Sequence, residues 1–225
     1  MIASHHIIFD CDGVLVDSEP LSMKVDVQIL AENGVGMSED EAHARFVGKT
    51  FAAMIDEIAQ EFGVVFPADL SVQKDQRLLD LYARELKIVP GVAAALRAIA
   101  HQHYSVASNS PAERVETALR LTGLGGFFGN RITTFEHVAR PKPAPDVFVE
   151  AARRVGYQPE QCIVIEDSVT GVTAAHAARC KVLGFAGTHP QPAVQSPKLL
   201  AAGAHYVFHH MDALPNLVQG ILHAA

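Results

Sequence analysis

The sequence of 225 residues has no tryptophan, only three cysteines and 7% aromatic residues. Cys11, Cys162 and Cys180 lie far apart and form no CxxC pair, which favours reduced thiols over a disulfide framework or a zinc site. No apolar run reaches the about 18 residues that a membrane-spanning helix needs, and no signal-peptide pattern begins the chain. We therefore expect a cytoplasmic protein without a membrane partner.

Positive charge is also scarce. Lysine and arginine total 18 against 25 acidic residues, which gives a formal net charge of −7, and they form no basic cluster. Binding to nucleic-acid phosphates depends on such clusters, so the composition argues against a nucleic-acid partner. Hydrophobic residues make up 49% of the chain and charged residues 19%, which is typical of a globular protein with a substantial core. The twelve histidines are scattered, and we interpret them as loop and strand-end residues.

Short apolar runs rich in Ile, Val and Phe recur along the chain, at residues 6–10, 104–108, 162–167, 181–187 and 205–209. Uninterrupted runs of this length predict strands that are buried on both faces, as in a parallel sheet. Helix-length segments lie around the second and third runs, at residues 91–102, 111–123, 145–156 and 169–180. Strands that alternate with helices predict a doubly wound parallel α/β sheet, with ligands bound beyond the carboxyl ends of the strands.

The interval between the first two expected strands contains helical patterns only, at residues 21–34, 38–46, 50–63 and 68–87. A stretch of about 70 residues is too long for one crossover connection. We therefore expect two domains: an α/β core of residues 1–17 and 88–225, and a helical domain of residues 18–87 inserted after the first strand. A helical insertion beside a catalytic crevice often closes over it.

Polar side chains cluster in four motifs, three of them directly after an expected strand. They are Asp10 and Asp12 in HIIFDCDG, Ser108 and Asn109 in VASNS, Lys142 in RPKPAPD, and Glu166 and Asp167 in VIEDS. The carboxyl ends of parallel strands share one edge of the sheet. We therefore expect two acidic pairs, a hydroxyl and a lysine to converge at that edge.

Two carboxylates at the end of a buried strand repel each other unless a cation lies nearby. Carboxylate oxygens are the ligands that Mg²⁺ prefers, so the two acidic pairs predict a Mg²⁺ cofactor. An aspartate beside that cation and facing a phosphate can attack phosphorus to form an aspartyl-phosphate. A second group must then protonate the leaving oxygen and later deprotonate water, and Asp12 is placed to do both.

Each motif alone also has a plainer interpretation. Asp10 and Asp12 are compatible with turn residues that make local hydrogen bonds. Ser108 is compatible with a helix cap, and Ser110 is expected to cap the helix that begins near residue 111. Lys142 is compatible with a surface lysine, and the second acidic pair with helix-start acids favoured by the helix dipole. The four motifs together favour the catalytic interpretation.

In order and spacing, DCDGVLVDSE, VASNS, RPKPAPD and VIEDS resemble the four motifs of the haloacid dehalogenase superfamily of phosphotransferases. Over essentially its whole length the chain resembles the β-phosphoglucomutase-like phosphatases, whose helical cap is inserted after the first motif. This resemblance implies Asp10 as the nucleophile and Asp12 as the general acid and base. It implies a metal site at Asp10, Asp12 (through its backbone carbonyl) and Asp167, supported by Glu166.

The same resemblance implies that Ser108 and Asn109 bind phosphate, and that Lys142 steadies both the nucleophile and the phosphate. In the cap, DSE (17–19) and VGKT (47–50) resemble hinge and specificity elements. Glu19 and Lys49 are therefore candidate substrate contacts.

The mutase of this subfamily is expected to carry a cap histidine and a cap arginine where this chain has Ser22 and Phe51. We therefore expect a Mg²⁺-dependent phosphatase that hydrolyses a small phosphorylated metabolite, either a sugar phosphate or a sugar-acid phosphate. A β-phosphoglucomutase-type mutase and a non-catalytic binding protein on the same fold are the alternatives. The sequence leaves open whether the protein is a monomer or a homodimer.

Overall fold

The computed structural model describes residues 5–46, 50–100 and 103–223. The chain divides into two compact units, one formed by residues 1–17 with 87–225 and the other by residues 18–86. In the described part of the chain, none of the helices has the length and apolar character that a membrane crossing requires.

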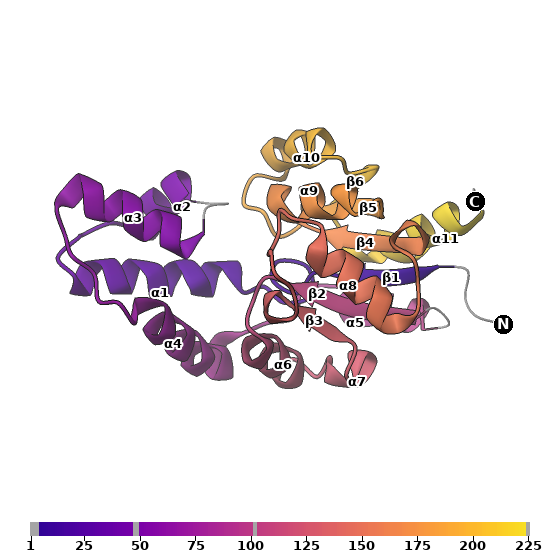
Figure 1. Ribbon diagram of the computed structural model, residues 1–225, viewed down its shortest axis with the longest axis horizontal. Helices are drawn as coiled ribbons and strands as arrows, with labels where there is room; N and C mark the ends of the chain where they lie inside the picture. The colour runs from indigo at the N-terminus through magenta and orange to yellow at the C-terminus, as the bar shows by residue number, and fades with distance from the viewer. Residues whose placement is uncertain (1–4, 47–49, 101–102, 224–225) are drawn as a thin grey trace. The chain divides into compact units, whose positions relative to one another are not determined.

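The first unit is built around a six-stranded, fully parallel sheet in the order β3-β2-β1-β4-β5-β6 (Figure 1). The strands are β1 (His6–Phe9), β2 (His103–Ser108), β3 (Ile132–Thr134), β4 (Cys162–Glu166), β5 (Lys181–Phe185) and β6 (Tyr206–Phe208). The apolar runs of the sequence form all of these strands except β3, and the doubly wound α/β fold is confirmed. Strand β3 was not expected because three residues are too few to stand out as an apolar run.

The same unit contains the α-helices α5 (Val92–Ala98), α6 (Ala112–Leu121), α7 (Gly125–Phe128), α8 (Asp146–Val155), α9 (Val169–Ala177), α10 (Pro192–Ala201) and α11 (Leu214–His223). Three 3₁₀ turns are η1 (Phe135–His137), η2 (Pro159–Gln161) and η3 (Met211–Ala213). The helical segments expected around the second and third apolar runs form α5, α6, α8 and α9.

Strand β1 lies at the centre of the sheet and pairs with β2 on one side and β4 on the other. Phe9 therefore stands level with Val106 of β2 and Ile165 of β4. From β1 the chain runs outward to β2 and β3, then crosses to β4 on the other side of β1 and continues outward to β6. The carboxyl ends of β1 and β4 are therefore the switch point where open α/β sheets bind ligands. The N–H of Asp10 donates to the carbonyl of Ile165 at 2.9 Å, so the two strand ends stay aligned there.

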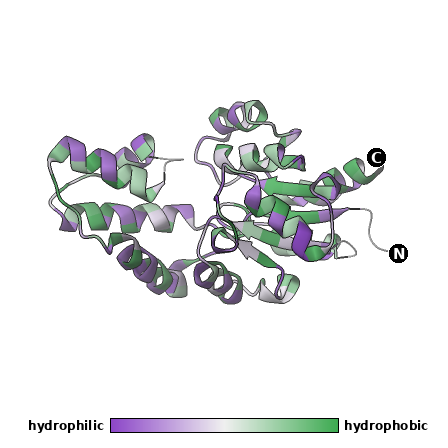
Figure 2. Ribbon diagram, viewed as in Figure 1, coloured by the Kyte–Doolittle hydropathy of each residue, from purple (hydrophilic) through white to green (hydrophobic). Residues whose placement is uncertain are grey.

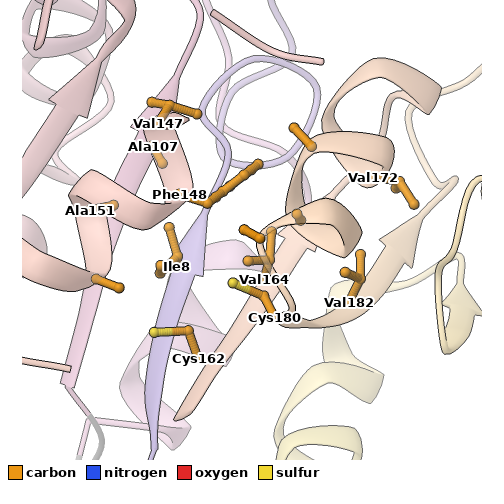
Figure 3. Packing of buried hydrophobic residues seen from close by; sticks show 14 of the residues in the cluster. Ile8, Ala107, Val147, Phe148, Ala151, Cys162, Val164, Val172, Cys180 and Val182 are labelled. Carbon is orange, nitrogen blue, oxygen red and sulfur yellow. The ribbon is translucent and has the colours of Figure 1, made fainter. Parts of the chain in front are cut away.

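The sheet is apolar on both faces because helices cover both of them. Ile8, Val164 and Val182 pack on one face with residues of α8 and α9 (Figure 3). On the other face Phe9 meets the ring of Phe128 at 6.0 Å between centroids, in an edge-to-face arrangement. Figure 2 shows the result, with predominantly hydrophobic strands and helices that alternate between hydrophilic and hydrophobic residues.

The second unit consists of helices α1 (Glu19–Glu32), α2 (Glu39–Phe46), α3 (Phe51–Phe62) and α4 (Leu70–Glu85). Its buried apolar cluster comprises Leu30, Val35, Ala42, Phe46, Met54 and Ile58. A buried ion pair between Lys74 Nζ and Asp26 Oδ1, 2.6 Å apart, joins α4 to α1. Removal of either partner would leave an uncompensated buried charge, so this pair fixes how the two helices pack.

His6, the first residue of β1, is fully buried in the first unit. Its Nε2 lies 2.9 Å from Ser105 Oγ, and its ring centroid lies 5.1 Å from that of Tyr157. Burial lowers the pKa of His6 to about 4, and the nearby charges of His103 and Arg131 act in the same direction. The imidazole is therefore neutral in the folded protein at neutral pH.

We expect this buried imidazole to make the fold sensitive to acid. The unfolded chain takes up a proton at His6 from the ordinary value of 6.5 downward, whereas the folded protein does so only near pH 4. Between pH 7 and pH 5 this difference removes about 2 kcal/mol from the free energy of unfolding. Urea unfolding followed by circular dichroism should show that His6→Gln loses this part of the pH dependence, while His210→Gln, at an exposed histidine, keeps it. Parallel pH profiles for His6→Gln and the wild type would contradict the assignment.

Candidate active site

The loop after β1 turns sharply so that Asp10 and Asp12 stay at the carboxyl end of the strand. The N–H groups of Leu15 and Val16 donate to the carbonyl of Cys11 at 2.9 and 3.1 Å. Gly13 has a φ of +74°, a left-handed conformation that glycine adopts without steric cost. The Thr188 hydroxyl, from the loop after β5, donates to the Gly13 carbonyl at 2.8 Å and anchors the turn. Sequence reasoning gave no role to Thr188.

Lys142 lies at the centre of the site. Its Nζ donates to Asp10 Oδ1 at 2.5 Å, to Glu166 Oε1 at 2.7 Å and to the Ala107 carbonyl at 2.9 Å. All three donors of the ammonium group therefore have a partner, one from the end of each of the strands β1, β2 and β4. Lys142 is buried, as are both carboxylates. The ammonium group of Lys142 thus contacts residues of all three other motifs.

Asn109 holds the backbone of Lys142. The Lys142 N–H donates to Asn109 Oδ1 at 2.9 Å, and Asn109 Nδ2 donates to the Lys142 carbonyl at 3.1 Å. This two-way clamp fixes a loop that lies 33 residues away in the chain. The structure therefore gives Asn109 a positioning contact, whereas the sequence resemblance implies a contact with phosphate.

The electrostatics of this cluster follow from its burial. Burial raises the pKa of Asp10 well above its usual range, and the charges of Glu166 and Asp12 act in the same direction, while Lys142 opposes them. Burial alone would lower the pKa of Lys142, but the Asp10 and Glu166 carboxylates outweigh it and keep the pKa above its usual value. Lys142 is therefore a permanent cation. Two carboxylates, Asp10 and Glu166, share one ammonium, and the charge of Asp12 also acts on Asp10, so a second cation would relieve the remaining repulsion.

Both carboxylate oxygens of Glu166 already have partners. Oε1 accepts from Lys142, and Oε2 accepts from the N–H and the hydroxyl of Ser168, each at 3.0 Å. Ser168 in turn caps α9 by accepting from the N–H of Gly171 at 2.9 Å. A Cβ at Gly171 would lie 1.7 Å from Glu166 Oε1, so only glycine leaves room for this side chain.

Asp167 places its carboxylate against the loop after β1. A Cβ at Gly13 would lie 2.0 Å from Asp167 Oδ2, so the missing side chain of Gly13 makes room for the acid beside the turn that carries Asp10 and Asp12. Among the described residues no group of three or more His, Cys, Asp or Glu side chains is gathered as a metal cage. Mg²⁺ does not require one, because it commonly binds through one or two carboxylates and keeps several waters. The acidic oxygens at this edge therefore fit a Mg²⁺ ion.

Ser108 and Ser110 follow β2, and both are buried. Ser108 Oγ accepts from the N–H of Ser110 at 3.0 Å. The expectation that Ser110 caps the next helix was wrong. The N-cap residue of α6 is Pro111, and no side-chain hydrogen bond caps the helix there. Glu136 accepts from the Ala112 N–H at 2.8 Å instead. The hydroxyl of Ser110 donates to Asp12 Oδ2 at 2.5 Å, a contact that local sequence patterns do not reveal because it joins residues 98 positions apart.

The two candidates in the helical unit stay predictions. Lys49 lies outside the described residues. Glu19 is the exposed first residue of α1.

Comparison with known proteins shows to which family this chain belongs. A family model of haloacid dehalogenase-like hydrolases matches residues 7–185. The chain belongs to the haloacid dehalogenase-like hydrolase family. The 6-phosphogluconate phosphatase of Escherichia coli (strain K12) is 30% identical over 214 residues, which cover 94% of this chain and 93% of that protein. The fructose-1-phosphate phosphatase of the same strain is 30% identical over 174 residues, 76% of this chain and 91% of that protein.

A solved structure of a HAD family hydrolase from Deinococcus radiodurans R1, with bound phosphate and sodium, shares 32% sequence identity with this hydrolase. The match has a TM-score of 0.78 and covers 99% of this chain and 98% of that one. Because the family model and these phosphatases match most of the chain, the protein is a phosphomonoester hydrolase of the haloacid dehalogenase-like family.

The close approach at Gly171 gives a test of how this hydrolase holds its acidic cluster. Gly171→Ala would displace the buried Glu166 carboxylate from Lys142, and we expect the free energy of unfolding to fall by about 2–4 kcal/mol. Gly220→Ala is the matched control because Gly220 also lies in a helix but has nothing within 4 Å of an added Cβ. That variant should gain about 0.5–1 kcal/mol. Equal stabilities for the two variants, measured by urea unfolding, would show that Glu166 is not confined as described.

Proposed function

We propose that this hydrolase is a Mg²⁺-dependent phosphatase that acts through an aspartyl-phosphate on Asp10. The observation that carries the proposal is the buried Lys142 ammonium, which bridges Asp10 and Glu166 at the switch point of the sheet. A nucleophilic carboxylate needs one oxygen held and a nearby positive charge that draws in the phosphate dianion. Lys142 supplies both at a single atom.

The proposed reaction has two steps. A carboxylate oxygen of Asp10 attacks phosphorus, the ester P–O bond breaks, and the leaving oxygen takes a proton from Asp12. A water oxygen then attacks the phosphorus, its proton passes to Asp12, and the bond between Asp10 and phosphorus breaks. Asp12 returns to its protonated form, so protons and bonds balance over the cycle. Ser108, at the end of β2, is proposed to donate its hydroxyl to the phosphoryl oxygens.

Mg²⁺, when bound, would neutralise charge on the phosphoryl group and on the acidic cluster. Asp10, Asp167 and the backbone carbonyl of Asp12 are the groups that we propose hold it. We assign Glu166 a different task from direct ligation, because both of its oxygens are occupied by Lys142 and Ser168. Glu166 then acts by keeping Lys142 in place, as the outer partners of metal sites commonly do.

The proposed substrate is the phosphate ester of a small sugar or sugar acid. The support comes from the relatives that match most of the chain, which are phosphatases of 6-phosphogluconate and fructose 1-phosphate. We propose that the helical unit selects among such esters, with Lys49 and Glu19 as the candidate contacts.

Phosphate release from 6-phosphogluconate, fructose 1-phosphate and p-nitrophenyl phosphate tests the chemistry. We expect release with Mg²⁺, loss of release with EDTA, and recovery when Mg²⁺ is added back. Asp10→Asn should lower kcat by at least about 10⁴-fold, because an amide oxygen is a poor nucleophile. Asp212→Asn, at an exposed carboxylate, should retain wild-type activity. Substantial turnover by a folded Asp10→Asn variant would refute the nucleophile assignment.

The metal assignment has its own test. Asp167→Asn removes a charged ligand, so the Mg²⁺ concentration that gives half-maximal activity should rise at least about tenfold. The variant should recover much of its activity at saturating Mg²⁺, as judged by a titration of the metal against initial rate. An unchanged Mg²⁺ requirement together with a lower kcat would mean that Asp167 does not hold the ion.

A further inference from the structure

Asp12 is in contact with a polar chain that runs to helix α6. Ser110 Oγ donates to Asp12 Oδ2 at 2.5 Å, and the Arg114 guanidinium, through one of its terminal nitrogens, donates to the same Ser110 oxygen. Ser110 lies in the loop between β2 and α6, and Arg114 lies in the first turn of α6. The four motifs contain Ser110 but not Arg114.

The chemistry of the three groups fixes the direction of this chain. A guanidinium has N–H donors and no acceptor, whereas a serine hydroxyl has one donor and two acceptor positions. Arg114 therefore occupies an acceptor position of Ser110, and the single hydroxyl hydrogen of Ser110 is directed to Asp12. A donor charge also polarises the hydroxyl, which strengthens its bond to the carboxylate.

We propose that Ser110 and Arg114 are positioning residues for Asp12, an inference that rests on the proposed role of Asp12 as general acid and base. Ser110 donates to Oδ2 and so fixes the orientation of the carboxylate that exchanges a proton with the leaving group. The side chain is thereby held in one rotation before substrate arrives. Such preorganisation matters because misplacement of a catalytic group by about 1 Å lowers rates by about 100-fold.

The surrounding structure holds both positioning residues in place. The backbone of Ser110 is tied to Ser108 Oγ, and Ser110 itself is only 4% exposed. The first turn of α6 is fixed from outside, because Glu136 Oε2 accepts from the Ala112 N–H at 2.8 Å and from the Thr134 hydroxyl at 3.2 Å. The end of β3 thus determines where α6 begins, and hence where Arg114 lies.

Two aryl esters of similar size provide the test. Phenyl phosphate has a basic leaving group that needs a proton, whereas p-nitrophenyl phosphate has a leaving group that departs without one. For a two-step enzyme, kcat/KM reports the steps up to departure of the leaving group and does not include hydrolysis of the aspartyl-phosphate. The ratio of the two kcat/KM values therefore measures how well the general acid performs.

We expect Ser110→Ala to lower kcat/KM for phenyl phosphate by about 10- to 100-fold and to change that for p-nitrophenyl phosphate by less than about twofold. Ser110→Thr, which keeps the hydroxyl, should recover most of the loss. Arg114→Gln should show a smaller selective loss, because an amide can accept as well as donate and no longer directs the Ser110 hydrogen. Arg120→Gln, at an exposed arginine of the same helix, is the control and should match the wild type.

The Asp12→Asn variant distinguishes a failure of the positioning role of Ser110 from a failure of the proposed general-acid role of Asp12. A selective loss with phenyl phosphate in Asp12→Asn, but an equal loss on both esters in Ser110→Ala, would overturn the positioning role and leave the general acid in place. An equal loss on both esters in Asp12→Asn would instead overturn the proposed role of Asp12, and the inference with it. A rise in KM for both esters in Ser110→Ala would mean that Ser110 binds phosphate, which also contradicts the inference.

Discussion

The ion pair of Lys142 with Asp10 and Glu166 is the contact on which the site depends. The carboxylates of Asp10 and Glu166 are buried at the ends of two strands of an apolar sheet, and unpaired charges there would be very costly. The Lys142 ammonium offsets this cost by filling its three donor positions with one partner from the end of each of three adjacent strands. The same charge that allows the acids to be buried also prepares the site for a phosphate dianion.

Glycine makes the remaining geometry feasible. Asp167 and Glu166 are successive residues, and each occupies space that a side chain would fill at Gly13 or Gly171. The Glu166 and Asp167 side chains therefore pack directly against the backbone of Gly171 and Gly13. Steric contact limits their orientation in addition to hydrogen bonds. Around that core, Asn109 and Thr188 hold the two loops that carry Lys142 and Gly13.

Much of the fold could be predicted from the sequence because buried parallel strands appear as continuous apolar runs, as in HIIF of β1 and CIVIE of β4. The convergence of Asp10 and Glu166 could also be predicted, since parallel strands end at one edge. Lys142 does not follow an expected strand, and it was placed at that edge only together with the other motifs. Strand β3 could not, because three residues carry too little pattern. The partner of Ser110 could not be predicted either, since a short polar residue before a helix has the same local signature whether it caps that helix or contacts a distant carboxylate.

Trapping the covalent intermediate tests the central claim most directly. Borohydride reduction of the enzyme during turnover of p-nitrophenyl phosphate should convert a phosphorylated aspartate to homoserine, which mass spectrometry of the tryptic peptides can place. The account predicts homoserine at position 10, dependent on both Mg²⁺ and substrate, and none in the Asp10→Asn variant. Homoserine at another position, or none while the wild-type enzyme turns over, would contradict the assignment of Asp10 as the nucleophile.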